Sequence, residues 1–165
     1  MNTPEITTLE AEIISTIKGI PKTSLPGKGD AEWTTAVKRA LMELGKKNEY
    51  SVCGFPPGCD PEWLYDMVWF RNDSSHYLRE IGLVLESEWQ KDPEAISYDF
   101  EKLLIAKSPI KVMVFQDFKA NSVPQLWSLL ERGIRTFKTE PVNEKYILAG
   151  FQNDEYEFAV KTIPA

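Results

Sequence analysis

The sequence predicts an α/β fold with a mixed β-sheet, in which an α-β-β-β-α-β core is flanked by helices and followed by a C-terminal helix and β-hairpin. Two observations lead to this prediction. Segments with apolar residues at helical spacing alternate with short apolar runs of strand character along the chain. Three strand candidates also follow one another without a helix between them, which indicates an antiparallel meander beside a helical crossover.

The N-terminal third predicts two helices. Apolar residues recur at helical spacing over 5–18, and the Pro- and Gly-containing segment 19–29 reads as a loop. A second helix is expected over 31–46, with Asp30 as its N-cap and Trp33, Val37, Leu41 and Leu44 on one stripe.

The remaining elements follow from the same patterns. Strands are expected at 49–55, 62–70, 81–89 and 110–116, the last a continuous apolar run typical of a buried strand. Helices are expected at 92–107, where Asp92 caps and Pro93 takes the first helical position, and at 121–137. Residues 145–163 predict a closing hairpin that turns at 153–154.

Length and composition indicate one folded domain over 1–165, with its core at about 30–116 and additions at 5–18 and 121–163. A net charge of −6 lowers the expectation of nonspecific nucleic-acid binding without excluding a nucleic-acid substrate. The first 14 residues lack the pattern of a signal peptide, and no apolar stretch predicts a membrane span, so a cytoplasmic protein with no membrane association is expected. In that compartment Cys53 and Cys59 are expected to be reduced, structural thiols.

Three acidic residues stand out on two consecutive strand candidates. Glu86 and Glu88 project to the same side of one strand because side chains alternate, and Asp66 interrupts the apolar strand before it. A hairpin register in which paired positions sum to 152 places Asp66 opposite Glu86. Opposed carboxylates destabilise a sheet unless a cation lies between them, and Mg²⁺ or Mn²⁺ prefers such oxygen ligands. The alternative is that Glu86 and Glu88 form the solvated face of a half-buried strand.

The element order and these motifs resemble the PD-(D/E)xK nuclease superfamily, also called the restriction-endonuclease-like fold. The resemblance covers about residues 30–116, with "LYDMVWF" and "LVLESEW" as the two motif strands. It implies that Asp66 and Glu86 are metal-binding acids. Glu88 stands where most members have Lys; some restriction enzymes of this superfamily use Glu there, and in other members the lysine lies on the following helix.

Lys102 is the candidate for such a displaced lysine, although its place on the helical wheel favours a solvated residue. The superfamily often has a further acid on its first core helix, for which Glu32 and Glu43 are options, both equally well explained as exposed helix charges. His76 lies in the loop between the acidic strands and is assigned no role.

The resemblance implies a metal-dependent endonuclease that hydrolyses DNA, with Asp66, Glu86 and Glu88 holding Mg²⁺ or Mn²⁺. Glu88 or Lys102 would position or deprotonate the attacking water. The rival interpretation is a catalytically inactive protein of this fold that binds a protein partner through its final hairpin and aromatic surface. The positions of Asp66, Glu86 and Glu88 distinguish the two: if these side chains do not converge within a few ångströms, the enzyme interpretation falls. A third possibility is a homodimer formed by the helix at 5–18 and the C-terminal hairpin, which suits a nuclease as well.

Overall fold

The computed structural model describes residues 3–23, 29–55, 63–138 and 143–164. Four helices and six strands follow one another: α1 (Thr3–Thr23), α2 (Asp30–Lys47), β1 (Ser51–Cys53), β2 (Met67–Asn72), β3 (Leu78–Glu88), α3 (Pro93–Leu104), β4 (Ile110–Gln116), α4 (Val123–Thr136), β5 (Lys145–Gln152) and β6 (Glu157–Pro164). The predicted mixed α/β architecture is confirmed.

The six strands form one sheet in the order in which they occur in the chain, β1-β2-β3-β4-β5-β6. Strands β1, β2 and β3 pair antiparallel, β3, β4 and β5 pair parallel, and β6 returns antiparallel to β5. Both α3 and α4 are therefore crossovers between parallel strands, whereas the sequence predicted only the first of them. The 14-residue helix α4 returns the chain to the end of the sheet at which β4 began. Strand β5 therefore runs parallel to β4.

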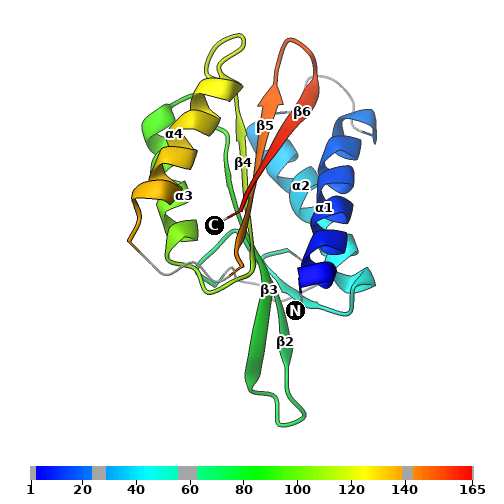
Figure 1. Ribbon diagram of the computed structural model, residues 1–165. Coiled ribbons are helices and arrows are strands. Elements are labelled where there is room, and N and C mark those ends of the chain that lie inside the picture. Colours follow the sequence, from blue (N-terminus) through cyan, green and yellow to red (C-terminus); the bar gives the residue numbers. More distant parts are fainter. Residues whose placement is uncertain (1–2, 24–28, 56–62, 139–142, 165) are drawn as a thin grey trace.

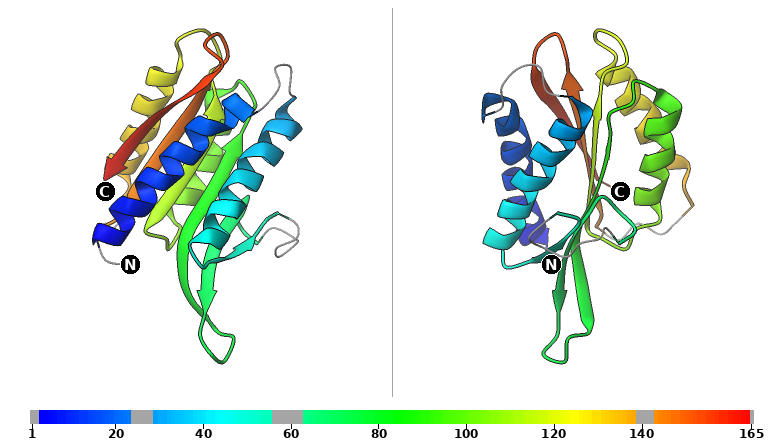
Figure 2. Two further views of the ribbon diagram at one scale, coloured as in Figure 1. Left: turned by 90° about the vertical axis from the view of Figure 1, so that its right-hand side faces the viewer. Right: turned by 180° about the vertical axis from the view of Figure 1, so that it is seen from behind.

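Two helices cover each face of the sheet. Helices α1 and α2 lie on one face, and α3 and α4 on the other, as Figure 1 and the two views of Figure 2 show. Side chains of β3 alternate between the two cores: Leu83 and Leu85 pack with the α1/α2 layer, and Val84 packs with the α3/α4 layer. The residues that follow Leu85 therefore stand between two helix layers at the end of an otherwise apolar strand.

The predicted hairpin register is confirmed over three pairs. Met67 pairs with Leu85, Val68 with Val84 and Trp69 with Leu83, after which two irregularities shift the register. The strand predicted at 62–70 is wrong at its start, because residues 64–66 are bends and β2 begins at Met67. Asp66 is therefore the last residue before the strand rather than a member of it, and residue 62 lies outside the described part.

The distal halves of β2 and β3 form a ribbon that projects from the body of the molecule (Figure 1). Pairing of β3 with β4 begins only at Leu83, so the ribbon is two-stranded along Leu78–Gly82. Cys53, at the end of β1, is disulfide-bonded, so the expectation of a reduced thiol is wrong there, and Cys59 lies outside the described residues. A membrane-crossing helix, one both long and apolar enough, is not found in the described ranges.

Candidate functional site

The position of Asp66 is set by a close backbone approach to Gly54 and by hydrogen bonds from Ser87 to its carboxylate. At Gly54 the backbone is left-handed, with φ of +104°, and an added Cβ would lie 2.1 Å from the Asp66 carbonyl oxygen. This approach, which only glycine permits, holds the segment before β2 against the end of β1. The Asp66 carboxylate then turns toward β3, where Oδ2 accepts hydrogen bonds from the Ser87 backbone N–H at 2.8 Å and from the Ser87 hydroxyl at 2.7 Å.

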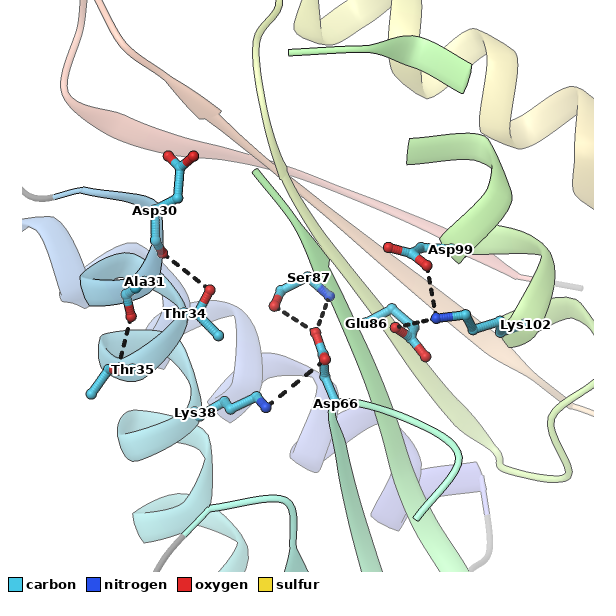
Figure 3. Close-up of polar contacts among 10 residues, drawn as sticks. All are labelled: Asp30, Ala31, Thr34, Thr35, Lys38, Asp66, Glu86, Ser87, Asp99 and Lys102. Carbon is cyan, nitrogen blue, oxygen red and sulfur yellow. Dashed lines mark hydrogen bonds and ion pairs between the residues drawn. The ribbon is translucent and has the colours of Figure 1, made fainter. Parts of the chain in front are cut away.

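Lys38 reaches the same carboxylate from α2. Its side chain is only 8% exposed, and its Nζ lies 3.9 Å from Asp66 Oδ1 (Figure 3). Because a charged side chain is seldom buried without a counter-charge, the sheet end and the α2 layer are joined here by an ion pair. The sequence did not single out Lys38, although it falls about 60° from Leu41 on a helical wheel, at the edge of the apolar stripe.

Glu86 is the buried carboxylate of the site. Its residue is 2% exposed, and its Oε2 accepts a hydrogen bond from Lys102 Nζ at 3.3 Å. Its Oε1 is buried and receives no hydrogen bond from the residues that the structure describes. Burial, and next the charge of Asp66, raise the pKa of Glu86 to about 8, although Lys102 acts in the opposite direction.

Lys102 bridges two carboxylates on the α3 side. Its Nζ lies 2.7 Å from Asp99 Oδ1, one helical turn earlier, as well as near Glu86 (Figure 3). The expectation that Lys102 is simply solvated is therefore wrong, because helix packing directs its ammonium onto the end of β3. Burial acts to lower the pKa of Lys102, but the Asp99 hydrogen bond and the Glu86 charge outweigh it and raise that pKa above its usual value.

Glu88 does not join the other two acids. Its carboxylate accepts a hydrogen bond from the Gln90 backbone N–H at 2.7 Å, just after the end of β3. Within the described ranges, no group of three His, Cys, Asp or Glu side chains could hold a metal ion. The predicted three-carboxylate cluster is thus not formed, and any metal site here depends on Asp66 and Glu86.

The other candidates lie away from this place. Glu32 turns its carboxylate back to the start of α2, where Oε2 accepts a hydrogen bond from the Gly29 N–H at 2.7 Å, and Glu43 is exposed. Gly29, not Asp30, is the N-cap of α2. His76 is exposed in the turn of the projecting ribbon, with φ of 65°.

The structure brings together Asp66 and Glu86 at the end of β3, each with a lysine from a different helix layer (Figure 3). Sequence reasoning missed Lys38, Ser87 and Asp99, although the position of Asp99 one turn before Lys102 is a recognisable pairing signal. No protein-family model, curated protein or solved structure matched this chain when it was compared with them.

Proposed function

We propose that this chain is a divalent-metal-dependent phosphodiesterase that acts on DNA, with Asp66 and Glu86 as metal ligands and Lys102 as the adjacent cation. The observation that carries the proposal is the buried Glu86 Oε1, which receives no hydrogen bond within the described part of the chain, beside a second carboxylate. A buried carboxylate oxygen without a donor is costly, and a bound cation would satisfy it.

Two carboxylates are too few to coordinate an ion fully by protein side chains, but they suit Mg²⁺ or Mn²⁺, which keeps water in its shell. Mg²⁺ commonly binds through one or two carboxylates and completes its shell with water and substrate phosphate. The convergence of three acids that the sequence set as the requirement for the enzyme is not met among the described residues, so the proposal rests on the narrower pair, Asp66 and Glu86. When bound, such an ion supplies a water of lowered pKa and offsets the charge that develops on the phosphate.

The surrounding residues have separate tasks in this proposal. Ser87 holds Asp66 Oδ2 through two hydrogen bonds and so orients the other oxygen, Oδ1. Lys102 stays protonated, because Asp99 and Glu86 raise its pKa, and therefore acts as a fixed positive charge beside the phosphate rather than as the base. Glu88 is hydrogen-bonded to the Gln90 N–H and has no task in this proposal.

The test combines binding and cleavage. We expect calorimetry to show saturable Mn²⁺ binding to the wild type, and an oligodeoxynucleotide to be cleaved only with Mg²⁺ or Mn²⁺. Asp66→Asn should abolish the binding and reduce cleavage by at least about 100-fold, because one of two protein ligands is lost. Glu43→Gln, at an exposed position on α2, is the matched control and should change neither. Cleavage that persists in Asp66→Asn would contradict the proposal.

A specific observation also favours the second candidate, an inactive protein of this architecture that binds a protein partner. Large apolar side chains are exposed at the base and tip of the projecting ribbon: Trp63 (45%), Leu64 (80%), Tyr77 (74%) and Leu78 (51%). Exposed apolar surface of this kind is typical of interaction sites. Light scattering tests the simplest partner, a second copy: a dimer mass that Leu64→Ser with Tyr77→Ser reduces to a monomer would support it, and a monomeric wild type would exclude it.

A further inference from the structure

We infer that β6 is an interaction edge, at which a second copy of this chain adds its own β6 antiparallel and so continues the sheet across a twofold axis. The inference goes beyond the proposed function and does not depend on it, because β6 forms the edge of the sheet and β3 lies in its interior. It is carried by a regular edge strand, by a hollow along that edge, and by charges that favour one pairing of β6 with itself.

The edge formed by β6 has few of the features that protect exposed sheet edges. Strand β6 is the last in the sheet and pairs with β5 over eight residue pairs without an irregularity (Figure 2). By contrast, β1 at the opposite edge is only three residues long. An edge strand presents unpaired backbone N–H and C=O groups, which proteins shield with short strands, bulges, proline or charge. In β6 the proline is the last residue and Lys161 is the single lysine, so a backbone partner can add along most of the strand.

A hollow of about 550 Å³ follows the first half of this edge. Its walls come from Lys18 and Pro21 near the end of α1, from Trp127 of α4, and from residues 155–160. Helices α1 and α4 lie on opposite faces of the sheet, so a hollow that contacts both lies around the edge of β6 rather than over one face (Figure 2). Another segment can therefore reach this edge, and the half-buried Trp127 offers it apolar surface.

Symmetry restricts how β6 can pair with a second β6. In an antiparallel ladder, two residues that face each other are either both hydrogen-bonded across the ladder or both not. Outward-directed backbone groups recur at every second residue, so positions that face each other across a twofold axis have numbers with an even sum. The registers that keep five or more residues of β6 paired therefore have sums of 318, 320, 322 or 324.

The charges of β6 favour one of these registers. At a sum of 318, Glu157 faces the partner's Lys161, and Lys161 faces the partner's Glu157. Phe158 then faces Val160, and Ala159 lies on the axis opposite its own copy. Opposite charges, and an aromatic residue beside a β-branched one, are favourable cross-strand pairs. A sum of 322 would place Lys161 opposite itself, and sums of 320 and 324 leave each paired charge opposite an apolar residue.

Lys161 can take part in this contact without leaving its present partner. Its Nζ lies 2.5 Å from Glu131 of α4, and its side chain is still 38% exposed, so the ammonium group can donate to a second carboxylate. Glu131 is also paired with Arg135 at 2.6 Å, so it keeps a cation if Lys161 is replaced. Charge exchange between Glu157 and Lys161 is therefore a feasible test of the interface.

The experiment measures the mass of the chain in solution by light scattering, over a series of concentrations and with no ligand added. We expect the wild type to approach twice the chain mass of 18.9 kDa as concentration rises. Glu157→Lys should weaken the dimer at least about tenfold, because two attractive pairs become repulsive. Glu157→Lys combined with Lys161→Glu should restore most of the affinity, since the exchanged charges still face each other. Glu101→Lys, the same charge change at an exposed position on α3, is the matched control and should have no effect.

Ala159 tests the register itself, because on the axis it meets its own copy. Ala159→Asp and Ala159→Lys should each weaken the dimer, and an equal mixture of the two should form a heterodimer that native mass spectrometry detects. If either of these variants does not fold, the variants of Glu157 and Lys161 decide.

A wild type that stays at the mass of one chain at every concentration would overturn the inference, as would a dimer that Glu157→Lys leaves intact. A dimer that only Leu64→Ser with Tyr77→Ser dissociates would place the interface at the projecting ribbon and overturn it as well. Failure here is distinct from failure of the proposed function, because Mn²⁺ binding and cleavage are measured separately.

Discussion

At the scale of single residues, the site is dominated by the burial of Glu86. The carboxylate is 2% exposed, and burial together with Asp66 raises its pKa from 4.5 to about 8. The folded protein therefore binds more protons than the unfolded chain between about pH 4.5 and pH 8. By linkage, this residue contributes stability at low pH that is lost as the pH rises through that window.

Glu86→Gln should abolish the loss of stability that the wild type shows as the pH rises, because glutamine stays neutral at every pH. We expect the free energy of unfolding of the variant to exceed that of the wild type by roughly 1–3 kcal/mol near pH 9, with little difference near pH 4.5. Urea denaturation at a series of pH values measures this. Glu88→Gln on the same strand is the control, and a Glu86→Gln variant that is less stable than the wild type at pH 9 would contradict the account.

At the scale of elements, the site depends on how β1 approaches the start of β2. Gly54 has a left-handed backbone, and a Cβ there would collide with the Asp66 carbonyl. Gly54→Ala should lower the free energy of unfolding by roughly 1–3 kcal/mol and weaken Mn²⁺ binding, because the Asp66 backbone must move. Thermal unfolding and calorimetry measure the two effects.

Gly19→Ala is the matched control for that variant. Its added Cβ would meet no atom within 4 Å, and it lies inside α1, so stability should rise by roughly 0.5–1 kcal/mol with unchanged Mn²⁺ binding. Wild-type Mn²⁺ affinity in Gly54→Ala would show that the close approach does not position Asp66.

At the scale of the whole molecule, the net charge of −6 limits how a nucleic acid can bind. The proposed function places one lysine, Lys102, beside the phosphate, so few counterions are released on binding. The slope of log affinity against log salt concentration should be about −0.7 for a single strand, at constant Ca²⁺. Anisotropy titrations between low and moderate salt test this. A slope steeper than about −4 would show a basic surface elsewhere on the chain, and a slope near zero would show that the ionic contacts do not form.

The class of fold and much of the order of its elements follow from local patterns in the amino-acid sequence. Apolar periodicity placed four helices, located β4 at its observed bounds and predicted the register that pairs Met67 with Leu85. These features depend on which face of an element is buried, and that information is local in the chain. For the same reason the sequence placed Asp66 and Glu86 on neighbouring segments.

Which side chains meet at the site depends on the packing of the helices against the sheet. Lys38 reaches Asp66, and Lys102 with Asp99 reaches Glu86, because helices packed on opposite faces converge on one strand end. Glu88 is drawn instead to the Gln90 N–H, and α4 acts as a second crossover that makes β5 parallel. These outcomes depend on contacts between segments that are distant in the chain. The geometry of such contacts is set by the packing of helices on the sheet, and it leaves no periodic signal in the sequence.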